Sequence, residues 1–196
     1  MRRSVLRLKE RVVSVLPIPM HLGQPHAGTD LSPAMLQTFG LFDVLEENGW
    51  KYVKSENLCD PSRYYCDPTP EDSAFKAHNC RNIGLACQSI EKRVYEHAVT
   101  DNFLLIIGGD HSIPIGTLPA ITRARPNTGV VWVDAHADIN TPETSGSGNI
   151  HGMVAISPLL SFHFPCSSAS RIPPRLSEKC QFTSLIFLLQ AMPGAS

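Results

Sequence analysis

Two short, uninterrupted apolar runs constrain the fold of this chain more than any other feature. Residues 103–107 read Phe-Leu-Leu-Ile-Ile, and residues 129–133 read Gly-Val-Val-Trp-Val. A strand with one solvated face alternates apolar and polar side chains, whereas a strand buried on both faces is continuously apolar. Both runs therefore predict strands inside a parallel sheet whose two faces are covered by helices.

The rest of the pattern alternates strand-like and helical segments. Further strands are predicted at 12–16 and 50–53, and a short helix near 112–124. A longer helix is predicted over about 79–98, with an inward face made of Ile83, Ala86, Cys87, Ile90 and Val94. This alternation predicts an α/β fold in which a parallel sheet is flanked by helices in a three-layer α/β/α arrangement.

The segment after the first predicted strand indicates one continuous helix. Ser32 followed by Pro33 is a typical helix start, and Gly49 is a plausible end. The apolar face of this helix is made, at helical spacing, of Met35, Phe39, Phe42 and Leu45. Such a face is typical of a helix that packs against a core.

Ionisable side chains follow both apolar runs. Gly108-Gly109-Asp110-His111 comes after the first run, and Asp134, His136 and Asp138 come after the second. Alternate residues of an extended segment share one face, and ligands of parallel α/β sheets gather beyond the carboxyl ends of the strands. Carboxylate oxygens combined with imidazole nitrogens suit Mn²⁺ or Zn²⁺ better than a soft thiolate metal. The sequence therefore predicts a metal site at His111, Asp134, His136 and Asp138.

Neighbouring polar residues predict supporting roles. Asp110 either holds the second nitrogen of a metal-binding histidine or caps the helix that follows. Asn140 and the run 145–149 offer neutral hydrogen-bonding groups that suit the carboxylate of a small zwitterion. His151, beside Gly152, suits a proton shuttle near neutral pH.

Composition excludes several classes of partner. The 17 basic and 18 acidic residues give a formal net charge of -1, which provides no electrostatic basis for nucleic-acid binding. No apolar run approaches the roughly 20 residues that span a bilayer. The six cysteines include no C-x-x-C pair, and we expect reduced thiols in a cytoplasmic protein. The basic segment 1–11 is expected to be a solvated N-terminal extension, with a mitochondrial presequence as the alternative.

Three motifs together resemble a known family. Residues 108–112, 134–142 and 147–152, preceded by Gly23-Gln24-Pro25 and Gly28, are similar to the signatures of the arginases, members of the ureohydrolase superfamily. The resemblance covers residues 12–157, which we expect to form one arginase-like α/β domain. Agmatinase is the alternative within the superfamily, but the second and third motifs favour arginase.

The resemblance implies a hydrolase that uses two Mn²⁺ ions to convert L-arginine into L-ornithine and urea, in arginine catabolism and the urea cycle. His111, Asp134 and Asp138 would bind one ion, and Asp134 with His136 the other. The ions would lower the pKa of a bridging water for attack on the guanidinium carbon. His151 would act as proton shuttle or general acid. The substrate α-carboxylate would be contacted by Asn140, Ser145 and Ser147. Members of the family typically form homotrimers.

One part of the family pattern is missing from this sequence. Arginases carry a later Asp-x-Asp motif that completes both metal positions, whereas no aspartate follows Asp138 here. Residues 158–196 are rich in Ser, Pro and Cys and do not read as a further βα unit. We therefore expect a truncated fold, incomplete at its C-terminus, with a divergent and poorly ordered tail over 158–196. The matching expectation for function is an inactive arginase isoform or a mispredicted gene product.

Overall fold

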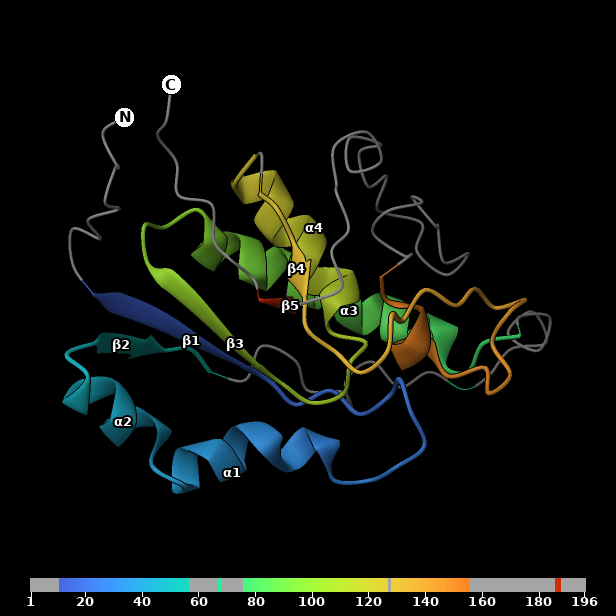
Figure 1. The fold of residues 1–196 in the computed structure, drawn as a ribbon, viewed down its shortest axis with the longest axis horizontal. Coiled ribbons are helices and arrows are strands. Elements are labelled where there is room, and N and C mark those ends of the chain that lie inside the picture. The colour runs from blue at the N-terminus through green and yellow to red at the C-terminus, as the bar shows by residue number, and fades with distance from the viewer. Residues whose placement is uncertain (1–10, 57–66, 68–75, 127, 156–185, 188–196) are drawn as a thin grey trace.

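The computed structural model describes residues 11–56, 67, 76–126, 128–155 and 186–187 (Figure 1). Its strands are β1 (Val12–Ile18), β2 (Lys51–Lys54), β3 (Phe103–Gly108), β4 (Val131–Trp132) and β5 (Ile186–Phe187). Its α-helices are α1 (Ser32–Thr38), α2 (Leu41–Glu47), α3 (Cys80–Ala98) and α4 (Pro114–Ala124). Two short 3-10 helices, η1 (Thr29–Leu31) and η4 (Ile150–Met153), lie in the connecting segments.

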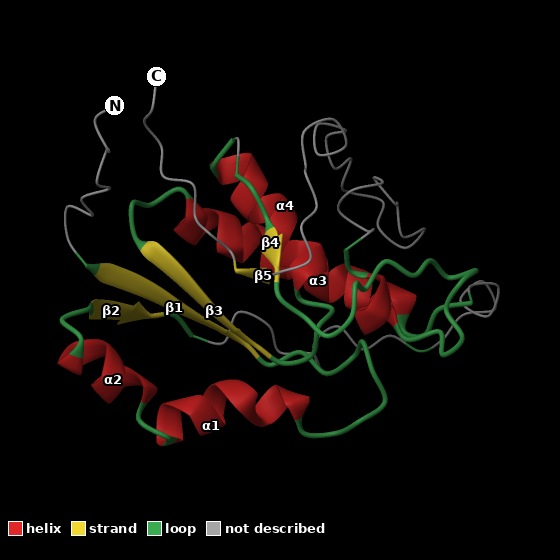
Figure 2. Cartoon of the chain, viewed as in Figure 1, coloured by secondary structure: helices red, strands yellow, loops and turns green. Residues whose placement is uncertain are grey.

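A parallel sheet forms the middle layer, with strands in the order β2-β1-β3. β1 pairs with β3 from Val13 opposite Phe103 to Ile18 opposite Gly108. The helices α1 and α2 lie on one side of this sheet, and α3 and α4 lie on the other (Figure 2). The predicted α/β class, with a parallel sheet between helical layers, is confirmed.

Side chains of β1 alternate between two cores, as the pleat of a strand requires. Val13 and Val15 pack with Ile107 and with the partly buried side chains of α2. Leu16 and Ile18 join the larger core, which α3 and α4 cover. The five residues predicted to face inward from the helix at 79–98 are all buried on α3, so that prediction is confirmed.

The prediction of one continuous helix from Ser32 is wrong. The chain instead forms α1 and α2, which are separated at Gly40, where φ is 87°. A right-handed helix does not continue through a left-handed residue, and glycine adopts that conformation without a Cβ penalty. The break leaves Met35 and Phe39 of the predicted apolar face 49% and 74% exposed. Only Phe42 and Leu45, beyond the break, pack against the sheet.

The strand predicted at 129–133 is shorter than expected and has a different partner. β4 pairs antiparallel with β5 in a separate two-stranded sheet, not with the parallel sheet. The apolar run predicts a buried segment, and Trp132 is indeed buried against the larger core. A hydrophobic pattern specifies that a segment is covered, but it does not name the strand that pairs with it.

Two sequence predictions lie mostly outside the described residues. The N-terminal extension is described only at Arg11, whose guanidinium donates to Asn48 O at 3.3 Å. The tail predicted over 158–196 is described only at β5. Within the described part of the chain, no helix combines the length and hydropathy that crossing a membrane demands.

Arg125, at the end of α4, is hydrogen-bonded to the end of α3 and to the residues that follow α3. Its buried guanidinium donates to the carbonyls of Ala98, Thr100 and Asn102 at 2.9, 2.9 and 3.2 Å. We expect Arg125→Met to lower the free energy of unfolding by about 2–3 kcal/mol, because three charge-assisted hydrogen bonds from a buried guanidinium are lost. The change is measured by urea denaturation.

The neighbouring Arg123→Met is the control for this prediction. Arg123 is 46% exposed, pairs with Glu91 and lies 4.2 Å from the ring centroid of Tyr95. Ion pairs and cation–π contacts of a half-exposed side chain are each worth about 0.5 kcal/mol, so this substitution should cost about 1 kcal/mol, less than Arg125→Met. Equal losses for the two arginine variants would contradict a special role for the buried guanidinium.

Candidate metal centre

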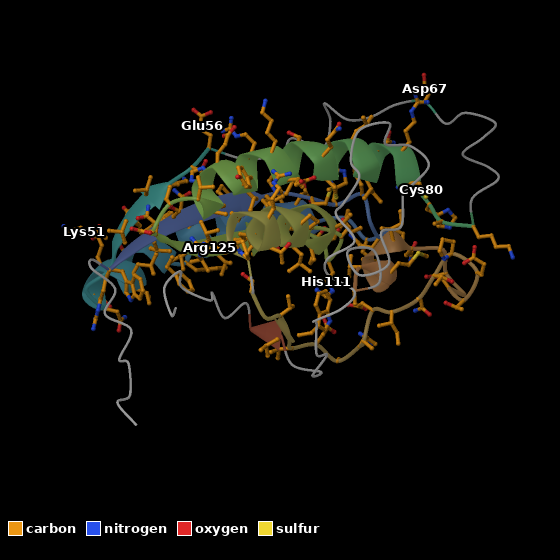
Figure 3. All side chains as sticks on the ribbon, turned by 90° about the horizontal axis from the view of Figure 1, so that it is seen from above. Lys51, Glu56, Asp67, Cys80, His111 and Arg125 are labelled. Atoms are coloured by element: carbon orange, nitrogen blue, oxygen red, sulfur yellow. The ribbon has the colours of Figure 1, made fainter. Side chains whose placement is uncertain are left out.

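Three potential metal ligands converge beyond the ends of β3 and β4. His111 Nδ1 lies 2.8 Å from Asp138 Oδ2 and 3.4 Å from Asp134 Oδ2. One ligand atom from each residue falls within 4.8 Å of the others. Figure 3 shows the His111 side chain close to the loop that follows β4. The structure thus brings together three of the four residues predicted to bind metal, from two strand ends.

Close backbone packing puts His111 at this edge of the sheet. Gly109 N donates to Ile18 O at 3.2 Å, and Asp110 N donates to Met20 O at 2.8 Å. A Cβ at Gly109 would lie less than 3.0 Å from three backbone atoms of Met20. Only glycine allows this approach, so the chain turns at once after β3 and presents the next side chains to the site.

Asp134 is held by a turn of its own segment. Its Oδ1 accepts a hydrogen bond from His136 N at 2.9 Å, and this donor lowers the pKa of the Asp134 carboxyl despite partial burial. The charge of His111 acts in the same direction. Asp134 is therefore ionised at neutral pH and available as a ligand, as a metal site needs.

Asp138 has a different environment from Asp134. Its side chain is buried, and burial raises the pKa of its carboxyl, while nearby His111 opposes that shift. Its φ of 51° lies in the left-handed region, which aspartate tolerates better than most residues. Ala155 N donates to Asp138 O at 3.0 Å and links the backbone of this residue to the segment that follows η4.

The buried Oδ2 of Asp138 has few partners within the chain. It lies 2.8 Å from His111 Nδ1, and no other described residue donates to this oxygen. Buried carboxylate oxygens normally have a partner. A divalent cation between His111, Asp134 and Asp138 would satisfy it, so the residues present fit a metal ion of the hard or borderline class.

His136 lies beside this cluster but not in it. Its side chain is 82% exposed, and its Nδ1 lies 3.5 Å from Asp134 Oδ1. Asp134 therefore has one oxygen directed to His111 and the other to His136. A carboxylate in this position has the geometry to contact two ions.

The loop predicted to bind a carboxylate uses its polar side chains locally. Ser145 Oγ accepts from Gly148 N at 3.0 Å, and Ser147 Oγ accepts from Asn149 N at 3.3 Å. Asn140 Oδ1 accepts from the Thr144 hydroxyl at 3.3 Å. These hydrogen bonds shape residues 140–149. The groups that can donate to a carboxylate are the hydroxyls of Ser145 and Ser147 and the amide nitrogen of Asn140.

His151 lies in η4 and faces another part of the chain. Its Nδ1 is 3.1 Å from Gly23 O, and its backbone N–H donates to the same carbonyl at 3.1 Å. Sequence reasoning did not connect Gly23 with His151. It also passed over Trp132, whose ring centroid is 4.9 Å from that of His111. The position of this tryptophan, two residues before Asp134, was the available signal.

Comparison with known proteins identifies the family. A model of the arginase family matches residues 11–172 of the chain. The chain belongs to the arginase family. Human arginase-1 is 37% identical over 148 residues, which are 74% of this chain and 43% of that protein. The arginase of Bacillus caldovelox is 36% identical over 141 residues, which are 72% of this chain and 46% of that one.

Solved arginase structures share the fold. The structure of Bacillus caldovelox arginase matches with a TM-score of 0.67 at 32% identity. The match covers 76% of this chain and 49% of the Bacillus caldovelox chain. Bacillus cereus arginase matches with a TM-score of 0.66 at 35% identity, and this match covers 76% of this chain and 48% of the Bacillus cereus chain. The chain therefore spans about half the length of these family members. Relatives also include the human protein named arginase-2, mitochondrial, at 38% identity over 152 residues, so membership of the family does not fix the compartment.

Proposed function

We propose that this chain carries a manganese site of the arginase type, whose reaction is the hydrolysis of L-arginine to L-ornithine and urea. The observation that carries the proposal is the convergence of His111, Asp134 and Asp138 at the ends of two strands. Two carboxylates and an imidazole are ligands that Mn²⁺ accepts. The arginases that match this chain over most of its length support the choice of substrate.

In this proposal, His111, Asp134 and Asp138 would hold one Mn²⁺, and Asp134 and His136 would be the residues available to a second. When bound, manganese supplies Lewis acidity that lowers the pKa of water and makes it a nucleophile near neutral pH. Asp134 and Asp138 offset the positive charge, and Trp132 limits access of solvent to one side of the His111 ring.

The other proposed residues handle the substrate. Asn140, Ser145 and Ser147 orient the α-carboxylate of arginine through hydrogen bonds from the loop 140–149. Water would add its oxygen to the guanidinium carbon and lose a proton, which His151 would accept at Nε2. His151 would then pass this proton to the ornithine nitrogen as the bond between that nitrogen and the carbon breaks, which leaves ornithine and urea.

A second candidate is a metal-binding chain without turnover. It is favoured by the ligand count, because the described residues contain one group of three possible ligands, and only Asp134 and His136 face a second position. Residues 139–196 contain no aspartate. Two close dications held by so few carboxylates would repel each other.

Stoichiometry and urea release distinguish the two candidates. The hydrolase predicts two Mn²⁺ per chain by electron paramagnetic resonance titration and urea release from arginine above a metal-free control, whereas the second candidate predicts one Mn²⁺ and no urea. In either case, His136→Ala should keep only the ion assigned to His111, Asp134 and Asp138. Urea release that His136→Ala abolishes would establish the hydrolase and overturn the second candidate, whereas absence of Mn²⁺ binding would contradict both.

The substrate class is tested by binding. Agmatine is arginine without its α-carboxylate, so it removes the group that Asn140, Ser145 and Ser147 are proposed to contact. We expect the Mn²⁺-loaded chain to bind arginine about tenfold more tightly than agmatine, because a charge-assisted hydrogen bond is lost. Equal affinities, measured by calorimetry, would count against arginine and in favour of another ureohydrolase substrate.

A further inference from the structure

A buried carboxylate that the proposed function does not use lies next to the proposed metal ligand His111. Asp110 is 5% exposed, and both of its oxygens accept hydrogen bonds. Oδ2 accepts from Gly23 N at 2.7 Å, and Oδ1 accepts from Ser112 N at 2.9 Å and from the Ser112 hydroxyl. Because both oxygens act as acceptors, an amide side chain, which has one oxygen, could not make the same hydrogen bonds.

Gly23 connects this carboxylate with His151. Its N–H donates to Asp110, and its carbonyl lies 3.1 Å from His151 Nδ1. A Cβ at Gly23 would lie 2.9 Å from Asp110 Oδ1 and 2.8 Å from Ser112 Cβ. Glycine is thus the residue that fits between the turn after β3 and the ring of His151.

The contact with Gly23 decides the tautomer of the His151 ring. A carbonyl oxygen can only accept a hydrogen bond, so Nδ1 must carry the proton when it contacts Gly23 O. The neutral ring then has a bare lone pair at Nε2. This is the nitrogen that a proton shuttle uses when Nδ1 is held by the protein.

We propose that Asp110 is a positioning residue, which fixes Gly23 and through it the orientation and tautomer of His151. The role of His151 in proton transfer rests on the proposed function. The tautomer does not, because it follows from contacts among residues of the chain, with or without metal. Neither Asp110 nor Gly23 is proposed to touch the substrate.

Nuclear magnetic resonance of the full chain tests the proposal without any activity measurement. Long-range nitrogen–proton correlation spectra distinguish protonated from bare imidazole nitrogens, and His151→Gln assigns the signals. At about pH 8.5, where ordinary imidazoles with a pKa of about 6.5 are neutral, we expect the Nδ1-protonated form of His151 to predominate roughly fivefold. Asp110→Asn should reduce this bias toward an even mixture, because the amide cannot accept from both Gly23 and Ser112.

Ser112→Ala is the matched control. It removes the hydroxyl hydrogen bond to the same carboxylate but keeps the backbone donors of Ser112 and Gly23, so the His151 tautomer should stay as in the unchanged chain. A predominant Nε2-protonated ring in the unchanged chain would overturn the proposal. So would an Asp110→Asn chain that folds and keeps the original bias.

If Asp110→Asn fails to fold, the unchanged chain still decides the matter. The proposal then requires both the Nδ1-protonated ring and slow hydrogen exchange of the Gly23 amide, because that amide is held by Asp110. Rapid exchange of the Gly23 amide overturns the link. Loss of Mn²⁺ binding or of urea release in the same samples would affect only the proposed function.

Discussion

Replacing Asp138 with asparagine is expected to weaken Mn²⁺ binding about 100-fold, a loss at the upper end of what changes around a metal site cause. Asparagine has nearly the same shape and also tolerates the left-handed backbone of this residue, where φ is 51°. It replaces the buried anionic oxygen that lies 2.8 Å from His111 with a neutral group. Calorimetric titration of Mn²⁺ measures the effect.

The same substitution is expected to stabilise the metal-free chain. Burial raises the pKa of the Asp138 carboxyl, so the folded state disfavours its charged form. This loss of folding stability is absent when the pH is below the pKa of Asp138 in the unfolded chain. It grows as the pH rises through the higher pKa of Asp138 in the folded chain, so it is complete near neutral pH. Asp138→Asn removes it, and we expect the melting temperature without metal to rise by about 2–4 °C. The gain should shrink as the pH is lowered toward 4.

Asp67→Asn is the control for both effects. Asp67 is an exposed carboxylate outside the cluster, so its substitution should change neither Mn²⁺ affinity nor the melting temperature. If Asp138 binds metal at a cost in folding stability, Asp138→Asn should raise the melting temperature of the metal-free chain and lower its Mn²⁺ affinity. If both properties fell together, general unfolding would explain the loss of metal and the site assignment would be contradicted.

The sequence predicted that His111 and Asp138, 27 positions apart, would lie together, because each follows an apolar run, and the structure places them 2.8 Å apart. The assumed reason was only partly right, since β4 lies outside the parallel sheet. The buried face of α3 was predictable because periodicity alone selects it. In this case the pattern of local sequence determines the geometry.

The sequence did not predict the break between α1 and α2, the partner of β4 or the contact of Gly23 with His151. The local sequence pattern is compatible with more than one structure in each case. A glycine inside a helical pattern is compatible with a continuous helix, and only the positive φ of Gly40 separates α1 from α2. The apolar run ending at Val133 required burial but left the partner of β4 undefined. The contact between Gly23 and His151 joins residues 128 positions apart, and a glycine offers no side chain to indicate it.

Gly109→Ala is expected to have the largest effect on stability, a loss of about 3 kcal/mol or more in the free energy of unfolding. A Cβ at this residue would lie less than 3.0 Å from the O, N and C atoms of Met20. These are backbone atoms in the segment that follows β1, and they cannot turn away as the end of a side chain can. Relief requires separating the two strand ends, which breaks the hydrogen bonds from Gly109 N to Ile18 O and from Asp110 N to Met20 O.

Two neighbouring alanine substitutions make this prediction specific. A Cβ at Gly108 would come within 3.0 Å only of Cδ1 of Ile113, a flexible side-chain end, so Gly108→Ala should cost about 1 kcal/mol. Gly146 has open space around it and should tolerate alanine within about 0.5 kcal/mol. Urea denaturation of the three variants should therefore rank Gly109 well above Gly108 and Gly146. If Gly109→Ala were as mild as Gly108→Ala, the two strand ends could separate easily, and the backbone packing would not be what holds His111 at the proposed metal site.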